Sequence, residues 1–358
     1  ANYLAKQGHA VTVFETLPEP GGMMRYGIPE YRLPREVLAK EIEEIRSTGV
    51  DIRTNTKVNS LDELFEDGYN AIFLAIGAHQ GAKLGIEGED SPEVMEGVSF
   101  LREISMGNKV RVGNRVAVIG GGNVAIDASR TALRLGAREV TVIYRRTRAE
   151  MPASREEVEE ALHEGVRIEF LTAPTRIERK DGTVALTCTR MELGAVDASG
   201  RRRPVPIKGS EFSPDFDTVI TAIGQVPEAP EQFGLPLGKG NTFQVDLDTL
   251  ATIREGVFTG GEAVTGPATV IEAIAAGRQA AISMDKYLGG SGVIDETLVP
   301  PEEEVLPEIE EEEKPRVSIP SLPLCDRLNN FAEVELSLSE EAAVEEAKRC
   351  LRCDLEED

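Results

Sequence analysis

The sequence predicts an α/β protein that contains two strand–helix–strand units of one design. The clearest sign is the stretch 116–146, where an apolar strand, three consecutive glycines, a helix and a β-branched strand follow one another. A second sign is the N-terminus, where residues 1–8 have the pattern of a helix and residues 11–15 that of a strand. The third is a repeat, because two later strands both run into Ala-Ile-Gly, at 75–77 and 222–224. We therefore expect two Rossmann-like domains.

The three glycines between the strand at 116–119 and the helix at 124–135 suit a dinucleotide. Glycine lets the backbone approach a pyrophosphate closely, and the N-terminus of the next helix offers unpaired N–H groups and the positive end of its dipole. Ala125 takes the place of a third glycine and is small enough for close packing of helix on strand. The alternative is an ordinary tight turn, but the flanking strands and helix favour a dinucleotide site.

The end of the second strand indicates which dinucleotide binds. NAD sites usually carry Asp or Glu at this position, which accepts hydrogen bonds from the ribose hydroxyls. This strand ends instead in Arg145 and Arg146, with Arg148 just beyond. Guanidinium groups match a 2′-phosphate and do not replace the carboxylate. NADP(H) is therefore the favoured cofactor, and a solvated basic strand end is the alternative.

The first residues have the pattern of the back end of a second unit. A helix over 1–8 leads into a strand that ends at Glu15, the position of a ribose-binding carboxylate. The first strand and glycine turn of this unit would then lie before Ala1. Residues 18–34 follow as a loop rich in Gly and Pro with interleaved tyrosines. Such a loop is able to lie against a flat ligand, or it has a purely structural role.

The remaining apolar patterns predict the other elements. Helices are expected at 35–49, 98–106 and 267–288, strands at 50–58, 71–75, 166–172, 174–180, 183–193 and 218–222, and a hairpin or loop at 201–206. Residues 256–261 are expected to form a strand that runs into a glycine turn. Residues 291–322 are rich in Pro and Glu and lack a hydrophobic period, which is typical of a solvated acidic linker. Residues 323–358 are expected to form a short helical tail that contains cysteines.

The composition disfavours several classes of protein. The formal net charge is −24, and residues 291–358 alone carry 21 acidic and 6 basic side chains, so nucleic acid is an unfavourable partner. The sequence lacks a run of about 18 apolar residues that would cross a membrane, and the N-terminus lacks the pattern of a signal peptide. Two of the four cysteines are spaced CxxC, which fits a reducing, cytoplasmic compartment better than a disulfide framework.

Six motifs resemble one known family. GGMMRYGIPEYRLP, YNAIFLAIGA, VAVIGGGNVAID, VIYRRTRAEMPA, TAIGQVP and GPATVIEAIAAGR occur in the order and spacing of the glutamate synthase small-subunit family. That family includes the N-terminal flavin part of dihydropyrimidine dehydrogenase and the large subunit of electron-bifurcating transhydrogenases. The resemblance covers roughly residues 1–290. It implies a disulfide-reductase-type flavoprotein with two nested domains: an NADP(H)-binding domain, 91–239, inserted into an FAD-binding domain, 1–90 and 240–290.

The resemblance also implies which residues bind the cofactors. The positions that match FAD contacts of the family are Glu15, Gly21, Gly22, Arg32, Val58, Gly77, Gly261, Glu262, Thr269 and Val270, and those that match NADP contacts are Gly120, Gly122, Asn123, Val124, Arg145 and Arg146. Glu15 would bind the adenosine ribose of FAD, and Thr269 and Val270 would lie at the pyrimidine edge of the flavin. The family usually has Asp at position 262, so the ribityl contact of Glu262 must shift to fit one extra methylene.

The phrase EAKRCLRC, which contains Cys350 and Cys353, resembles the cluster-binding segment of the same family. Two thiolates three residues apart can bind one corner of an iron–sulfur cluster, which needs about four ligands. Zinc and an unligated redox pair are the alternatives. Missing ligands would lie before Ala1, on a partner or at Cys325. Cys188 stands alone on an expected strand, so we expect a buried core thiol there and no disulfide-reducing CxxC pair in the insert.

These patterns lead to one main hypothesis. The resemblance implies an NADPH-dependent flavin oxidoreductase subunit that passes electrons from NADPH through FAD to iron–sulfur centres and a redox partner subunit of a hetero-oligomer. The cofactors would carry out the hydride transfer, so no catalytic side chain is expected. The alternatives are an NAD(H)-linked or electron-bifurcating flavin subunit of a larger redox complex, and a non-catalytic, flavin-free assembly subunit.

Overall fold

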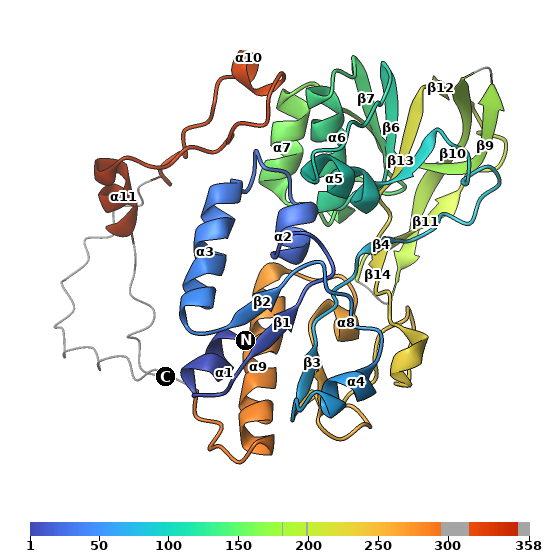
Figure 1. Ribbon diagram of the computed structural model, residues 1–358. Helices are drawn as coiled ribbons and strands as arrows, with labels where there is room; N and C mark the ends of the chain where they lie inside the picture. The colour runs from blue at the N-terminus through green and yellow to red at the C-terminus, as the bar shows by residue number, and fades with distance from the viewer. Residues whose placement is uncertain (181, 198–199, 295–314, 350–358) are drawn as a thin grey trace.

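A parallel five-stranded sheet lies in the upper part of the molecule in Figure 1. The computed structural model describes residues 1–180, 182–197, 200–294 and 315–349. In spatial order the strands are β5 (Val94–Glu96), β13 (Thr218–Thr221), β6 (Arg115–Ile119), β7 (Glu139–Ile143) and β8 (Arg167–Glu169). The central strands β13 and β6 are almost entirely buried, as expected of a parallel sheet that is covered on both faces.

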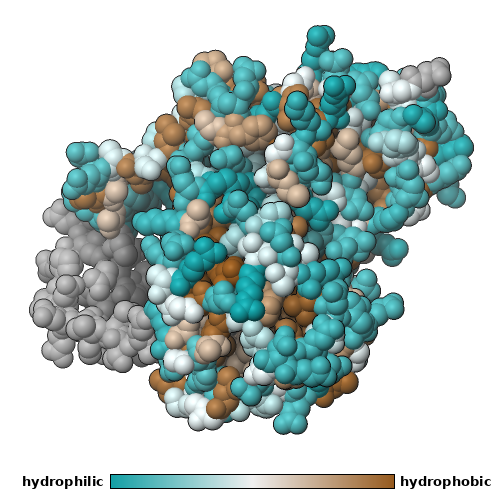
Figure 2. Space-filling view, in the orientation of Figure 1, coloured by the Kyte–Doolittle hydropathy of each residue, from teal (hydrophilic) through white to brown (hydrophobic). Residues whose placement is uncertain are grey.

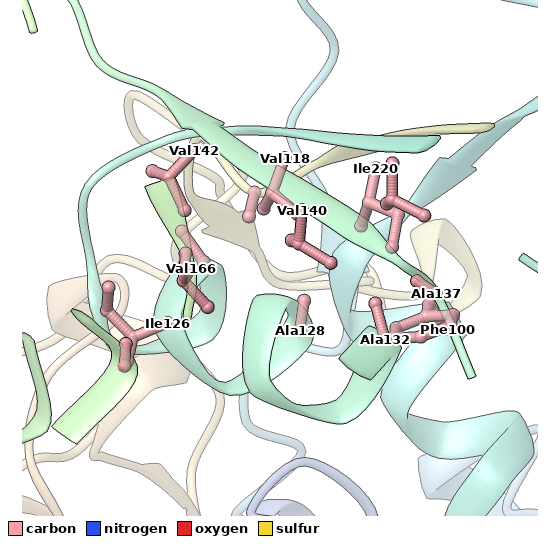
Figure 3. Close-up of a cluster of buried hydrophobic side chains, with 14 of the residues drawn as sticks. Phe100, Val118, Ile126, Ala128, Ala132, Ala137, Val140, Val142, Val166 and Ile220 are labelled. Carbon is pink, nitrogen blue, oxygen red and sulfur yellow. The ribbon is translucent and has the colours of Figure 1, made fainter. Parts of the chain in front are cut away.

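Helices cover one face of this sheet. They are α5 (Gly97–Ser105), α6 (Asn123–Arg134) and α7 (Arg155–His163). Alternate residues of β6 serve the two faces, so Val116 and Val118 pack with the helices while Ala117 and Ile119 pack on the other side. Figure 3 shows that α6 presents small residues, Ala128 among them, to the sheet. The strand–glycine–helix–strand unit predicted at 116–146 is thereby confirmed.

An antiparallel sheet covers the other face. It consists of β9 (Thr172–Lys180), β10 (Thr183–Val196), β11 (Arg202–Pro206) and β12 (Asp215–Phe216). Its apolar side chains, including Leu186 and Cys188, form one buried cluster with those of β6, β7 and β13. The strands expected at 174–180 and 183–193 are confirmed, and the expected hairpin or loop at 201–206 contributes β11.

The second unit is built from segments on both sides of the first in the sequence. Two parallel pairs of strands belong to it, β1 (Thr12–Phe14) with β2 (Asp51–Arg53) and β3 (Ile72–Leu74) with β15 (Val257–Thr259). Its helices are α1 (Asn2–Lys6), α2 (Gly22–Tyr26), α3 (Arg35–Ser47), α4 (Leu61–Glu66), α8 (Glu262–Thr265) and α9 (Val270–Tyr287). Because the whole five-stranded sheet lies between β3 and β15 in the sequence, one unit is nested inside the other, as expected.

Local details differ from the expectations in two places. The strand expected over 50–58 ends at Arg53, because the backbone turns at Asn55 with a positive φ of 53°. The loop expected over 18–34 contains the short helix α2, which begins just after Gly21. The helix and strand expected at the N-terminus, α1 and β1, are confirmed.

Two short strands connect the units. β4 (Gln80–Gly81) pairs with β14 (Gln225–Val226), so the connections into and out of the inserted unit run side by side. Each strand follows one of the two Ile-Gly repeats, and the Gln225 side chain donates a hydrogen bond to the carbonyl of Ala78 across them at 2.7 Å. The sequence repeat therefore marks the paired crossing points between the units.

The remaining described elements are short. They are η1 (Arg148–Glu150) in the loop after β7, η2 (Glu231–Phe233), α10 (Leu324–Arg327) and α11 (Glu340–Ala347). None of the described helices combines the length and the apolar character that a membrane crossing requires.

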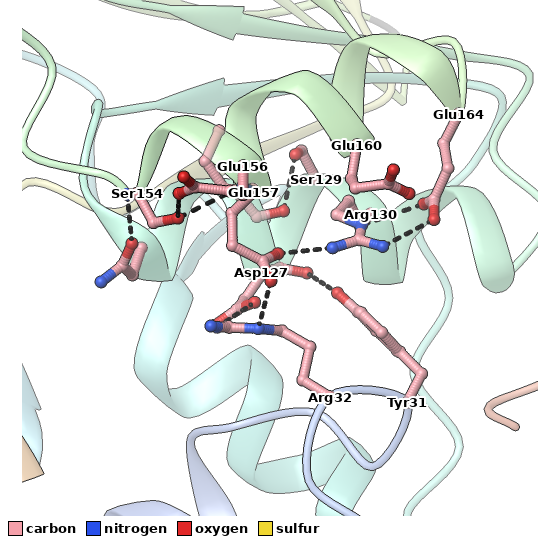
Figure 4. A network of polar contacts seen from close by, with 12 residues as sticks. Tyr31, Arg32, Asp127, Ser129, Arg130, Ser154, Glu156, Glu157, Glu160 and Glu164 are labelled. Atoms are coloured by element: carbon pink, nitrogen blue, oxygen red, sulfur yellow. Dashed lines mark hydrogen bonds and ion pairs between the residues drawn. The ribbon is translucent and has the colours of Figure 1, made fainter. Parts of the chain in front are cut away.

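A buried cluster of charged side chains joins the two units (Figure 4). Arg32, from the loop before α3, donates to both oxygens of Asp127 on α6 at 2.9 Å and pairs with Glu157 on α7 at 2.9 Å. Behind this pair, Glu164 accepts hydrogen bonds from both Arg130 and Arg134 at 2.6–3.1 Å. Buried charges are costly without partners, so this arrangement favours one orientation of the inserted unit.

We expect Glu164→Gln to lower the free energy of unfolding by about 3–5 kcal/mol at pH 7, because two buried guanidinium groups lose their anion. Burial would raise the pKa of Glu164, but hydrogen bonds from Arg134 and Arg130 hold that pKa at about 2, below its ordinary 4.5. The stabilisation is therefore complete above the ordinary pKa and is lost as the pH falls through about 2. Urea unfolding between pH 7 and about pH 2 measures both effects.

The matched control is Glu159→Gln on the same helix, whose partner Arg148 is exposed. This surface pair contributes only about 0–1 kcal/mol. Equal losses for the two variants, or a difference that grows towards acid pH, would contradict the assignment of Glu164 as the buried anion of the cluster.

Candidate functional site

The glycine turn between β6 and α6 is packed tightly on two sides and open on the third. Gly120 has a φ of +147°, and a Cβ there would lie 2.1 Å from the carbonyl oxygen of Ala222. A Cβ on Gly121 would lie 2.4 Å from the Tyr144 ring. At Gly122, however, the nearest atom to such a Cβ is 3.9 Å away, on Pro152. The turn therefore leaves a hollow at Gly122 that the backbone lines.

This hollow lies at the start of α6. Gly122 is the N-cap residue and no side chain caps this end of the helix, so its first N–H groups are available to a ligand. The Asn123 side chain accepts a hydrogen bond from the backbone N–H of Ser154 at 3.0 Å, and Ala153 donates to the carbonyl of Gly121 at 3.1 Å. Val124 is partly buried and packs against the helix cluster. The loop after β7 is thus held against the glycine turn.

The two arginines at the end of β7 have different surroundings. Arg146 is 5% exposed, pairs with Asp197 at 2.7 Å and donates to the carbonyl of Arg202 at 2.8 Å. Arg145 is exposed, and its guanidinium has no hydrogen bond or ion pair within the described part of the chain. Arg145 is therefore available to bind an anion, whereas Arg146 is already bound to protein groups.

A cavity of about 430 Å³ lies in the loop beyond these arginines, and sequence analysis did not predict it. Four apolar residues and two arginines line it: Ala149, Met151, Ala153 and Val158, with Arg148 and Arg155. An apolar cavity beside guanidinium groups suits a flat ring next to a negative charge. The only signal for this cavity in the sequence was the position of residues 148–158 directly after the strand–helix–strand unit. The apolar lining could not be predicted, because only the folded loop brings these side chains together.

Several of the residues that match FAD contacts lie just after the carboxyl ends of the paired strands β3 and β15. Gly77 and Gly261 both have positive φ values, 65° and 64°. A Cβ on Gly77 would lie 3.7 Å from a carboxylate oxygen of Glu262, so these positions are close together. The other oxygen of Glu262 accepts a hydrogen bond from the N–H of Ala268 at 3.2 Å. Ligands of open α/β sheets bind at this edge.

The start of α9 borders the same edge. Thr269 is its N-cap residue and forms a capping box with Glu272. Val270 and Ile271 in the first turn are 44% and 71% exposed. The helix thus begins with a positive dipole end beside exposed apolar side chains.

The remaining candidates of this unit lie in separate settings. Glu15 accepts a hydrogen bond from the N–H of Leu17 at 2.8 Å at the end of β1. Gly21 and Gly22 turn the chain with φ values of +126° and +51°, and nothing would meet a Cβ on Gly22 within 4 Å. Val58 packs against an apolar cluster around β3. The Arg32 guanidinium is bound to carboxylates of the inserted unit and not left open to a ligand.

The described cysteines are unsuited to redox chemistry on a disulfide. Cys188 is fully buried, as expected, and burial raises the pKa of its thiol to about 12. Cys325 is exposed on α10. In the described ranges, three or more His, Cys, Asp or Glu side chains do not come together as they would around a metal ion. Cys350 and Cys353 lie outside the residues that the structure describes.

Comparison with known proteins gives consistent matches. The family model described as pyridine nucleotide-disulphide oxidoreductase matches residues 1–277. The NADP(+)-dependent formate dehydrogenase subunit beta of Moorella thermoacetica is 45% identical over 99% of this chain and 52% of its own length. The glutamate synthase [NADPH] small chain of Escherichia coli is 35% identical over 80% of this chain and 66% of its own length. The chain thus spans only about half the length of the first of these relatives.

A solved structure confirms the fold. FprA from Mycobacterium tuberculosis, in complex with NADPH, has a TM-score of 0.68 at 21% identity, covering 80% of this chain and 82% of its own. The chain therefore shares its α/β fold with this solved structure.

The open hollow at Gly122 leads to a prediction that separates binding from folding. Gly122 has a φ of −92°, so Gly122→Ala fits the protein and should change stability by less than about 1 kcal/mol. If phosphates occupy the hollow, the new methyl group displaces them, and the affinity for NADP⁺ should fall about 10- to 100-fold. Titration calorimetry and thermal unfolding measure the two quantities.

The comparison variant is Gly120→Ala, which should cost at least about 2 kcal/mol of stability, because its methyl group meets the carbonyl of Ala222 in a left-handed region. Unchanged NADP⁺ affinity in Gly122→Ala would show that the hollow does not bind the dinucleotide.

Proposed function

Because the chain belongs to the pyridine nucleotide-disulphide oxidoreductase family and is related to glutamate synthase small chains, we propose that it is the NADPH-oxidising flavoprotein part of a larger electron-transfer complex. The observation that carries the proposal is the open glycine hollow at Gly122 together with the unpaired Arg145 at the end of β7. On this proposal residues 91–239 bind NADP(H), and residues 1–90 and 240–290 bind FAD.

The inserted unit would hold NADPH through its backbone and the exposed Arg145 guanidinium. The hollow at Gly122, which the tight turn at Gly120 leads into, would accommodate a pyrophosphate, and the N-terminus of α6 would supply N–H donors. Arg145 would bind the 2′-phosphate, and the adjacent cavity would take the adenine. Arg146 would support this site from behind, because its salt bridge with Asp197 fixes the strand end.

The outer unit would hold FAD. Its matching positions are Glu15, Gly21, Gly22, Arg32, Val58, Gly77, Gly261, Glu262, Thr269 and Val270, of which Arg32 is already bound to Asp127 and Glu157. The residues present fit such a group, since Gly22 and Gly261 leave room for a close ligand and the Glu262 carboxylate lies beside Gly77. When both cofactors are bound, they supply hydride transfer from the nicotinamide to the flavin. The protein contributes position and electric field, and the N-terminus of α9 would favour nearby negative charge by roughly 0.3–1 kcal/mol.

Electrons would leave towards sulfur-bound metal outside this chain's described part. Cys188 is buried with a raised pKa, which disfavours disulfide reduction in the inserted unit. We assign Cys350 and Cys353 as two ligands of an iron–sulfur cluster completed by cysteines elsewhere, with zinc as the competing occupant. The named relatives are subunits, which supports a role within a hetero-oligomer, and we place that complex in the cytoplasm as part of the same proposal.

The direct test is anaerobic mixing of the flavin-loaded protein with NADPH. We expect the flavin absorbance near 450 nm to bleach roughly in proportion to added NADPH, since hydride transfer empties the oxidised flavin band. Stopped-flow absorbance measures the rate. Absence of bleaching in protein that retains its flavin would identify a non-catalytic assembly subunit instead.

The choice of nucleotide has a separate test. Arg145→Glu should weaken NADPH binding about 10- to 100-fold by removing a charged contact to the 2′-phosphate, with little effect on NADH. The control is Arg167→Glu, the same charge reversal at an exposed position on the neighbouring strand β8, opposite Thr141 and so before the end of β7. Equal losses for NADPH and NADH in Arg145→Glu would show that Arg145 does not contact the 2′-phosphate.

A further inference from the structure

The described C-terminal segment packs across the junction of the two units. Residues 320–336 fold back on themselves: Leu322 donates to the carbonyl of Val334 at 2.9 Å, and Leu336 donates to that of Pro320 at 2.8 Å. Within this bend lies α10, near α7 in Figure 1. The segment is therefore a small folded element and not an extended tail. We call residues 320–336 the C-terminal bend.

One side of the C-terminal bend contacts the outer unit. Val334 is buried, and its N–H donates to the carbonyl of Tyr31 at 2.9 Å. The rings of Phe331 and Tyr31 have centroids 6.3 Å apart, within the range of favourable aromatic pairs. The bend therefore holds the backbone and the ring of Tyr31, the residue before Arg32.

The other side of the C-terminal bend contacts the inserted unit. Arg327 is only 4% exposed, forms an ion pair with Glu160 on α7 and lies 3.8 Å from a carboxylate oxygen of Glu164. Glu164 is the same carboxylate that binds Arg130 and Arg134 of α6. A guanidinium at the end of α10 thus completes the buried cluster shown in Figure 4.

Tyr31 links these contacts. Its ring lies under two guanidinium groups of α6, with the carbon of Arg134 3.9 Å and that of Arg130 4.9 Å from the ring centroid. Its hydroxyl donates to the backbone carbonyl of Asp127 at 3.4 Å. Three segments far apart in the sequence therefore converge on one fully buried tyrosine.

The position of this junction has a consequence for both nucleotide sites. Asp127 lies in the first turns of α6, just after the glycine hollow, and the loop with Tyr31 and Arg32 follows the Gly21–Gly22 turn. The chain connects the two units through the short paired strands β4 and β14, and Arg35 on α3 also donates to the Ser105 hydroxyl on α5 at 3.1 Å. The contacts that hold Tyr31 and Arg32 against Asp127 therefore also help to set where α6 begins relative to the Gly21–Gly22 turn.

We propose that the C-terminal bend is a clamp that fixes the inserted unit in the orientation required for hydride transfer, with Arg327 and Phe331 as positioning residues. This inference rests on the proposed function for its kinetic consequence, but not for its structural one. The clamp acts through Tyr31 and the buried cluster rather than through the glycine hollow at Gly122 or the residues that follow β3 and β15.

The test compares Arg327→Leu with Arg316→Leu, an exposed arginine just before the bend whose partner is Glu346. In Arg327→Leu we expect flavin bleaching by NADPH to slow about 10- to 100-fold, because a misplacement of about 1 Å has effects of this size. The NADP⁺ affinity and flavin content should stay as in the wild type. Amide hydrogen exchange of residues 28–34 should accelerate. Arg316→Leu should change none of these.

Two further variants keep the test decisive. Arg327→Lys retains the charge and should restore most of the rate, and Phe331→Ala should act in the direction of Arg327→Leu even where that variant folds poorly. Wild-type bleaching rates together with unchanged exchange in Arg327→Leu and Phe331→Ala would overturn the clamp. If the wild type itself does not bleach, the proposed function fails, and the exchange of residues 28–34 alone decides the clamp.

Discussion

The buried pairing of Arg32 with Asp127, backed by Glu164 and its arginines, is the interaction on which the arrangement of the two units depends. The inserted unit leaves and rejoins the outer unit through the paired strands β4 and β14 alone. Such a connection is compatible with many relative orientations. Buried charges select among them, because each needs its partner in place and a misaligned partner leaves a charge unpaired.

This kind of interaction gives specificity more than stability. Replacing a buried ion pair by apolar residues is often neutral or stabilising, so the cluster is not needed merely to hold the units together. Burial raises the pKa of Asp127 to about 6 in spite of its pair with Arg32. Asp127 is therefore more costly to keep ionised than Glu164, whose pKa is lowered instead. Because Asp127 lies on α6 and pairs with Arg32 of the other unit, its charge fits a role in orientation.

The two candidate sites are built in different ways. The NADP(H) candidate is formed by consecutive residues of one strand–turn–helix, and its hollow is made by the backbone. The FAD candidates come from segments between Glu15 and Val270, which the pairing of β3 with β15 brings together in part. An overall charge of −24 does not prevent anion binding at the first site, because Arg145, Arg148 and Arg155 gather locally near the end of β7.

The sequence by itself determined the features whose physical cause is local. Three glycines between two apolar stretches predict the turn at 120–122, because only glycine tolerates the close contact with Ala222 and the left-handed backbone. The longer strands and helices of the inserted unit also follow from local apolar periodicity, whereas the short strands β5 and β12 were not predicted. The arginine pair after β7 was likewise visible, since both residues follow directly from the strand end.

Only the tertiary structure decided which arginine pairs with which carboxylate and which arginine stays exposed. It turned Arg146 inward to Asp197 and left Arg145 exposed, and it paired Arg32 with Asp127, 95 positions away. It also placed Arg327 against Glu160 from the far end of the chain. Arginine is the same residue at each of these positions, so its chemistry cannot distinguish them in the sequence. The choice of partner depends on which carboxylate the fold buries nearby, and that is a property of the packed chain.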